Sequence, residues 1–118
     1  MSANLFANLP APMAEEGFDI LLEAENVTIE RIVSHGHNSP ASGWYDQSRH
    51  EWVVVLQGEG LIAFDNGEEV TLRAGDHLVI PAHRRHRVAR TAPDQDTVWL
   101  AVHYDRATSR PQAPGGKQ

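Results

Sequence analysis

Short segments rich in β-branched and aromatic residues alternate with turn-forming residues along most of the chain. Each segment is bounded by Gly, Pro, Asn or Asp, and no helical repeat separates one segment from the next, which excludes alternating β–α units. The pattern predicts an all-β protein, a sandwich or barrel of antiparallel strands. The predicted strands are residues 26–34, 51–57, 60–65, 69–73, 77–81, 85–90 and 97–104.

Two local patterns at the borders of these segments add detail. Asp65-Asn66-Gly67 supplies residues that tolerate a positive φ, as a tight hairpin between neighbouring strands requires. Before the first strand, Phe18, Leu21 and Leu22 form a weak apolar stripe at helical spacing. Ala14–Ala24 is therefore the only helix candidate.

The segment 51–57 is apolar on both faces except at Glu51. Because alternate side chains of a strand point to opposite faces, Val53 and Val55 share the face of Glu51, and the strand is expected to be buried on both sides. A buried carboxylate is costly unless it is paired, hydrogen-bonded or bound to a metal ion. We therefore expect Glu51 to have a specific partner.

His103 shares one face of its predicted strand with Trp99 and Ala101. Burial among such neighbours lowers the pKa of an imidazole unless a nearby carboxylate compensates. His103 is expected to be a ligand, an acid–base group or a hydrogen-bonded structural histidine.

The length of 118 residues is sufficient for one domain with its own core. We place this domain at residues 26–105, after an N-terminal arm (1–25) and before a Pro- and Gly-rich tail (106–118) that is expected to be disordered. The second apolar face of the strand that carries Glu51 predicts a homodimer. That face consists of Trp52, Val54 and Leu56.

Composition excludes several classes of protein. The chain has no cysteine, which rules out a disulfide scaffold, a thiolate zinc site and a cysteine nucleophile. Its net charge of −6 argues against a nucleic acid or an anionic membrane as a partner. No apolar run is long enough to span a bilayer, and the N-terminus lacks the pattern of a secretory signal, so a cytoplasmic location is expected.

Two stretches resemble the sequence motifs of the cupin superfamily. From Gly75, a proline follows after six residues at Pro81 and a histidine five residues later at His86, as in the second cupin motif. Glu51 and Gly58 match the end of the first motif. The resemblance extends from about Asn26 to Tyr104, and it implies an antiparallel β-barrel, or jelly roll, with an internal pocket.

The resemblance also implies a metal site, because many cupins bind Fe, Mn, Zn or Ni through two histidines and a glutamate of the first motif and the histidine of the second. The two first-motif histidines correspond here to Trp44 and Asp46. Of the remaining candidates, Glu51, His86 and Asp46 are the expected ligands of a divalent metal ion. His35 and His37 are either a displaced ligand pair or part of a surface loop.

The resemblance leaves two classes of function open, since cupin folds support both. The first is a divalent-metal enzyme acting on a small molecule, as an oxygenase, isomerase or lyase, with His103 as the acid–base partner and Trp44, Tyr45 and Gln47 in the substrate pocket. The alternative is a non-catalytic domain that binds or senses a small ligand and whose metal site is lost or weak.

Overall fold

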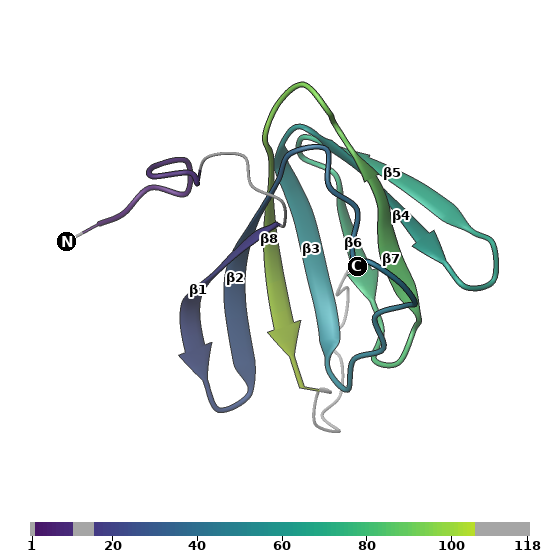
Figure 1. Cartoon of the computed structure of the whole chain (residues 1–118). Helices are drawn as coiled ribbons and strands as arrows, with labels where there is room; N and C mark the ends of the chain where they lie inside the picture. The colour runs from purple at the N-terminus through teal and green to yellow at the C-terminus, as the bar shows by residue number, and fades with distance from the viewer. Residues whose placement is uncertain (1, 11–15, 106–118) are drawn as a thin grey trace, which may run out of the picture.

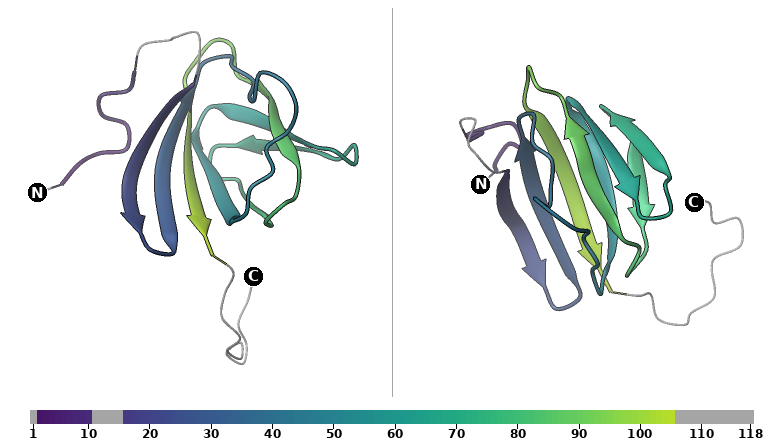
Figure 2. Two further views of the ribbon diagram at one scale, coloured as in Figure 1. Left: turned by 60° about the horizontal axis from the view of Figure 1, so that its bottom comes forward. Right: turned by 45° about the vertical axis from the view of Figure 1, so that its right-hand side comes forward.

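The computed structural model describes residues 2–10 and 16–105, and in these ranges all regular secondary structure is β-strand (Figure 1). The strands form two antiparallel sheets, one of five strands in the order β1-β2-β8-β3-β6 and one of three in the order β5-β4-β7 (Figure 2). The strands are β1 (Gly17–Ala24), β2 (Val27–Ser34), β3 (His50–Gln57), β4 (Glu59–Phe64), β5 (Glu69–Arg73), β6 (His77–Ile80), β7 (His86–Thr91) and β8 (Thr97–Tyr104).

All of the strands predicted from the sequence are present, so the all-β prediction is confirmed. The helix candidate Ala14–Ala24 is not helical where the structure describes it, because Gly17–Ala24 forms β1 and pairs with β2 from Gly17↔Val33 to Ala24↔Val27. The apolar residues of this segment are also compatible with a strand, and pairing with the free edge of β2 satisfies its backbone. No helix in the described part of the chain has the length and apolarity needed to cross a membrane.

Arg31 holds the beginning of the chain against the five-stranded sheet. Its side chain is buried and forms an ion pair with Asp19 of β1 at 2.6 Å. It also donates hydrogen bonds to the backbone carbonyls of Leu5 (3.1 Å) and Ala7 (2.9 Å). Part of the predicted arm is thus a strand of the sheet, and another part is attached to it. The predicted tail at 106–118 lies outside the described residues.

The core lies between the two sheets and is centred on Trp99 of β8. The indole is 2% exposed and its Nε1 donates a hydrogen bond to the Ser34 hydroxyl at 3.1 Å. Across from it, Gly60 of β4 permits this packing, since a Cβ at residue 60 would lie 2.3 and 2.4 Å from two carbons of the indole. The core also contains Val53, Val55, Ile62, Phe64, Leu72, Ile80 and Ala101.

The connection between β2 and β3 follows the free edge of β7 and extends the smaller sheet. Ser39 exchanges two backbone hydrogen bonds with Val88, of 3.0 and 2.7 Å. Further along, Tyr45 exchanges two with His86, of 2.8 and 3.2 Å. These bridges fix the direction in which the side chains of residues 44–47 point, and this direction decides which of them reach the interior.

Candidate functional site

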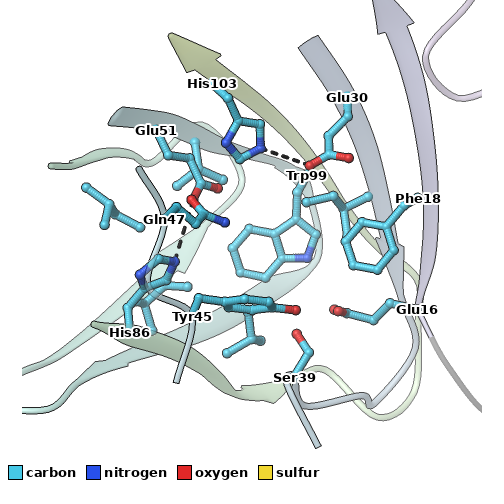
Figure 3. Close-up of a pocket in the computed structure, with 15 residues that line it drawn as sticks. Glu16, Phe18, Glu30, Ser39, Tyr45, Gln47, Glu51, His86, Trp99 and His103 are labelled. Carbon is cyan, nitrogen blue, oxygen red and sulfur yellow. Dashed lines mark hydrogen bonds and ion pairs between the residues drawn. The ribbon is translucent and has the colours of Figure 1, made fainter. Parts of the chain in front are cut away.

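A cavity of about 360 Å³ lies between the sheets and is lined by side chains of both (Figure 3). Aliphatic side chains such as Ile32, Val53 and Ile62 form much of its wall. Its titratable groups are three carboxylates and two imidazoles as well as a phenol, contributed by Glu16, Glu30, Glu51, His86, His103 and Tyr45. A small apolar cavity with a few converging polar groups is the usual form of a ligand site.

Glu51 and His86 face each other across this cavity from opposite sheets (Figure 3). Glu51 is 7% exposed, His86 is 4% exposed, and Oε1 of the carboxylate lies 3.6 Å from Nε2 of the imidazole. His86 Nδ1 donates a hydrogen bond to the Arg84 carbonyl at 2.8 Å. Because a carbonyl can only accept, this bond assigns the Nδ1 proton and directs Nε2 toward Glu51.

The pKa of His86 reflects two opposing influences. Burial lowers it, but the Glu51 carboxylate and the Arg84 carbonyl favour the imidazolium more strongly, so the net shift of the pKa is upward. His86 therefore retains its second proton to a higher pH than a free histidine does. That proton would lie on Nε2, the nitrogen that faces the carboxylate.

A second imidazole–carboxylate pair joins β8 to β2. His103 Nε2 lies 2.9 Å from Glu30 Oε1, and this contact raises the pKa of His103 despite partial burial. The sequence predicted a lowered pKa unless a carboxylate compensated, and Glu30 is that carboxylate. Glu51 is the residue directly opposite His103 in the β3–β8 pairing and raises its pKa further.

Tyr45 completes the polar part of the cavity beside His86. The two ring centroids are 5.6 Å apart, and the hydroxyl points into the cavity (Figure 3). Burial raises the pKa of the phenol, and the carboxylates of Glu16, Glu51 and Glu30 raise it further. Tyr45 therefore remains protonated over the physiological pH range and can donate a hydrogen bond to a ligand.

The structure brings together most, but not all, of the residues that the sequence nominated. Glu51, His86, His103, Tyr45 and Gln47 all line the cavity. In contrast, neither Asp46 nor Trp44 is among the cavity-lining residues.

Alternation along the β7 edge explains this division. Tyr45 pairs with His86 and points inward, so its neighbours in the chain point outward. Asp46 lies at the surface, 2.7 Å from His83 Nδ1 and 3.4 Å from Arg85 Nε, and the hydrogen bond from His83 is the main cause of its lowered pKa. Trp44 is 40% exposed and faces the Arg87 guanidinium.

These positions determine whether the cavity fits the metal ion that the motif resemblance implies. Among the described residues, no three His, Asp or Glu side chains are arranged to hold a metal ion. Glu51 and His86 provide two donors, while Nε2 of His103 faces Glu30 and Asp46 is at the surface. Protein metal sites of this kind use at least three protein ligands, so the residues present do not fit a resident metal ion.

His35 and His37 lie outside the cavity as well. The His35 ring contacts Asp96 at 3.0 Å, and the backbone N–H of His35 donates to His37 Nδ1 at 2.9 Å. Both side chains thus take part in the packing of a loop and are absent from the cavity lining. This arrangement agrees with the surface-loop alternative.

Sequence reasoning missed Glu16 and Glu30. Glu30 shares its face of β2 with Thr28, Ile32 and Ser34, and on such a mixed face no pattern distinguishes a glutamate that lines a cavity. Glu16 accepts a hydrogen bond from the Ser34 hydroxyl, which itself accepts from Trp99. Such a relay across the fold leaves no pattern in the local sequence.

Comparison with known proteins agrees with this geometry. Residues 30–103 match the family described as "Cupin domain" (Cupin_2). The chain belongs to the cupin family. The match covers most of the described β-structure, from the middle of β2 to the end of β8, and it includes Glu30, Glu51, His86 and His103.

Individual cupins show the same fold. A solved structure from Ralstonia eutropha JMP134, named as a "putative mannose-6-phosphate isomerase", is 45% identical, has a TM-score of 0.84 and covers 90% of this chain and 99% of its own. An RmlC-like cupin from Desulfovibrio desulfuricans is 23% identical, with a TM-score of 0.73 over 88% of this chain and 95% of its own.

The Bacillus subtilis (strain 168) protein named "Uncharacterized protein YjlB" is 32% identical in an alignment 94 residues long that covers 70% of this chain. The matched region spans 57% of that relative's length.

Proposed function

We propose that this cupin binds a small polar molecule in its cavity and transfers protons on it, as an isomerase or a lyase does. The observation that carries the proposal is the presence of two imidazole–carboxylate pairs, Glu51–His86 and Glu30–His103, around one cavity. Two acid–base groups at different places on one cavity wall allow one group to remove a proton while the other delivers one.

The roles follow from the orientation of each group. His86 is held by the Arg84 carbonyl with Nε2 toward the cavity, and Glu51 stabilises its protonated form. In the proposed reaction, one pair takes a proton from a carbon next to a carbonyl group, and the other gives a proton to the carbonyl oxygen. Tyr45 and Gln47 provide hydrogen bonds that orient the molecule.

The printed name of the R. eutropha protein supports the same class of reaction, since an isomerase of this type moves a proton between neighbouring carbon atoms. The identity of 45% over nearly the whole of both chains makes this support relevant to this cupin. The support that this name provides extends to the class of reaction and not to the substrate.

A divalent-metal enzyme is the function that the cupin motifs predicted. It would need a further donor beside Glu51 and His86, which the described residues do not supply. Elemental analysis of protein purified without a His-tag distinguishes the two mechanisms. Stoichiometric Fe, Mn, Zn or Ni that is lost in both Glu51→Gln and His86→Ala would overturn the metal-free proposal.

The alternative function is a non-catalytic ligand-binding or sensing domain. It is favoured by one observation, which is that both imidazoles of the cavity already face a carboxylate in this structure. A binding domain and an enzyme differ in one measurable respect, because only the enzyme exchanges substrate protons with solvent.

Deuterium incorporation tests the proposal without knowledge of the product. The protein is incubated in D₂O with a panel of aldoses and ketoses, and loss of carbon-bound proton signals is followed by NMR. We expect exchange with the native protein and a decrease of about a hundredfold in His86→Gln. The matched control is His77→Gln, since His77 is exposed on β6. Ligand binding without exchange would overturn the enzymatic proposal in favour of the binding domain.

We also propose a homodimer in the cytoplasm, as the sequence predicted. Support for the dimer comes from β1, where Phe18, Ile20, Leu21 and Leu22 are 46–60% exposed. On the face originally expected to form the contact, Val54 is buried and Trp52 is half-buried within the chain's own sheet. Light scattering that gives the 13.1 kDa mass of one chain at micromolar concentration would contradict the dimer.

A further inference from the structure

The charge of the cavity restricts what it can bind. Among the residues that the structure describes, three carboxylates line it, from Glu16, Glu30 and Glu51, and no lysine or arginine does. Within this described lining, His86 and His103 are the groups that can carry a positive charge, and the carboxyl groups outnumber them three to two. The low polarisability of the apolar cavity wall strengthens the effect of this charge on a ligand.

A buried acceptor without a donor points to the same kind of ligand. Oε1 of Glu51 is fully buried and has no hydrogen bond within the described residues, and His86 Nε2, at 3.6 Å, is too distant to form one. The carboxylate is directed into the cavity (Figure 3). A buried unsatisfied carboxylate oxygen is costly, and an N–H group of a ligand would remove that cost.

Aromatic rings form the other side of the space that this carboxylate faces. Phe18, Tyr45 and Trp99 come from three different parts of the fold and surround the middle of the cavity (Figure 3). Aromatic faces attract organic cations, and the attraction increases when water is excluded. The pKa of Tyr45 is raised mainly by burial; a hydrogen bond with Ser39 opposes this rise, and the three carboxylates add to it.

We propose that the ligand of this cupin carries a protonated amine, which binds between the Glu51 carboxylate and the aromatic rings. The inference rests on the proposed function, because it assigns a substrate class to the same cavity. It also argues against a phosphorylated sugar, since a phosphate group would add negative charge to a cavity whose described lining residues include no lysine or arginine to receive it. The charge of this cavity therefore does not suit the sugar phosphate that appears in the name of the R. eutropha protein.

The test compares three probes that share one sugar ring and differ in charge. Glucosamine, glucose and glucose 6-phosphate are titrated into the full-length protein at neutral pH by isothermal calorimetry. We expect glucosamine to bind about tenfold more tightly than glucose, as one additional charge interaction predicts, and glucose 6-phosphate to bind most weakly. Equal affinities, tighter binding of glucose or glucose 6-phosphate, or no binding of glucosamine would each overturn the inference.

A charge variant links the preference to the cavity. Glu16→Gln removes one cavity carboxylate outside the two proposed acid–base pairs and is expected to weaken glucosamine binding about threefold to tenfold, with less effect on glucose. Glu23→Gln is the matched control, because Glu23 lies on β1, the strand that follows Glu16, but is exposed and is absent from the cavity lining. An identical loss of affinity in both variants would overturn the assignment to the cavity.

The outcomes separate this inference from the proposed function. A preference for glucosamine without proton exchange on any substrate would retain the amine site and overturn the enzyme. Proton exchange on a sugar phosphate, together with tighter binding of glucose 6-phosphate, would retain the enzyme and overturn the amine site.

Discussion

Two histidine–carboxylate pairs of this cupin have the same chemistry and opposite surroundings. Glu51 and His86 are separated by 3.6 Å, and their side chains are 10% and 5% exposed. Asp46 and His83 are closer, at 2.7 Å, but their side chains are 39% and 68% exposed. Water screens the exposed pair, whereas the interior pair lies in a medium where charges interact strongly.

The comparison shows that contact distance alone does not identify a functional pair. The shorter contact is a surface ion pair shared with Arg85, of a kind that contributes little to stability. The longer contact leaves one carboxylate oxygen without a hydrogen bond and gives His86 a raised pKa inside a cavity. Burial, unsatisfied hydrogen-bonding capacity and a cavity together make a site available for a ligand.

The largest difference between the pairs is expected in catalysis. Glu51→Gln should decrease the rate of deuterium incorporation about a hundredfold, because His86 loses the charge that stabilises its protonated form. Asp46→Asn should leave the rate within about twofold of the native value, the scale of an indirect effect. Initial rates measured by NMR at one substrate concentration are sufficient, and equal losses in the two variants would refute the distinction.

The second-largest difference between the two pairs is expected in the free energy of unfolding. Glu51→Ala is expected to raise the free energy of unfolding by about 1 kcal/mol, because it removes a buried carboxylate oxygen that has no hydrogen bond, while His86 can still lose its proton and keep its bond to Arg84. Asp46→Ala should leave the urea midpoint unchanged. Urea denaturation followed by tryptophan fluorescence measures both variants, and a larger shift for Asp46→Ala would contradict the comparison.

The interior His103–Glu30 pair predicts a pH-dependent effect. Since folding raises the pKa of His103, its stabilising contribution is complete below the pKa of the unfolded chain, about 6.5, and is lost as the pH rises through the higher pKa of the folded protein. We expect about 1 kcal/mol, the scale of one hydrogen bond in a partly exposed pair. Urea midpoints across this pH range should show the step in the native protein and not in Glu30→Gln or His103→Gln.

The smallest expected effect is that of salt. Exposed charges are screened over a Debye length of about 8 Å at physiological ionic strength, and over a shorter distance when salt is added. Any residual difference between the native protein and Asp46→Asn should therefore disappear at high salt, while the effect of Glu51→Ala persists. Parallel denaturation curves at low and high salt make this measurement. Loss of the Glu51→Ala effect at high salt would indicate that the interior pair is open to solvent.

The sequence was informative wherever neighbouring residues decide the structure. Alternation and turn chemistry located the predicted strands, because these patterns reflect local backbone geometry. The same alternation identified Glu51 and His103 as inward-facing residues of β3 and β8, and the motif spacing identified His86.

The features that the sequence did not predict depend on contacts between segments that are distant in the chain. Counting back from Glu51 placed Trp44 and Asp46 at the site, but the bridge between Tyr45 and His86 turns residues 45 and 47 inward instead. Similarly, β1 became a strand because the edge of β2 was free to pair with it. Glu30 was not assigned as the partner of His103 because these residues are 73 positions apart.

The close packing of Gly60 against the indole of Trp99 has a consequence for the size of molecule that the protein can accept. Trp99 lines the cavity and Gly60 does not, so the ring separates the glycine from the cavity. Any side chain at residue 60 would overlap the ring and force it to move, and the open cavity offers the ring room to do so. Residue 60 thus sets the position of one cavity wall without touching the bound molecule, and related cupins could adjust their size selectivity by exchanging that single residue.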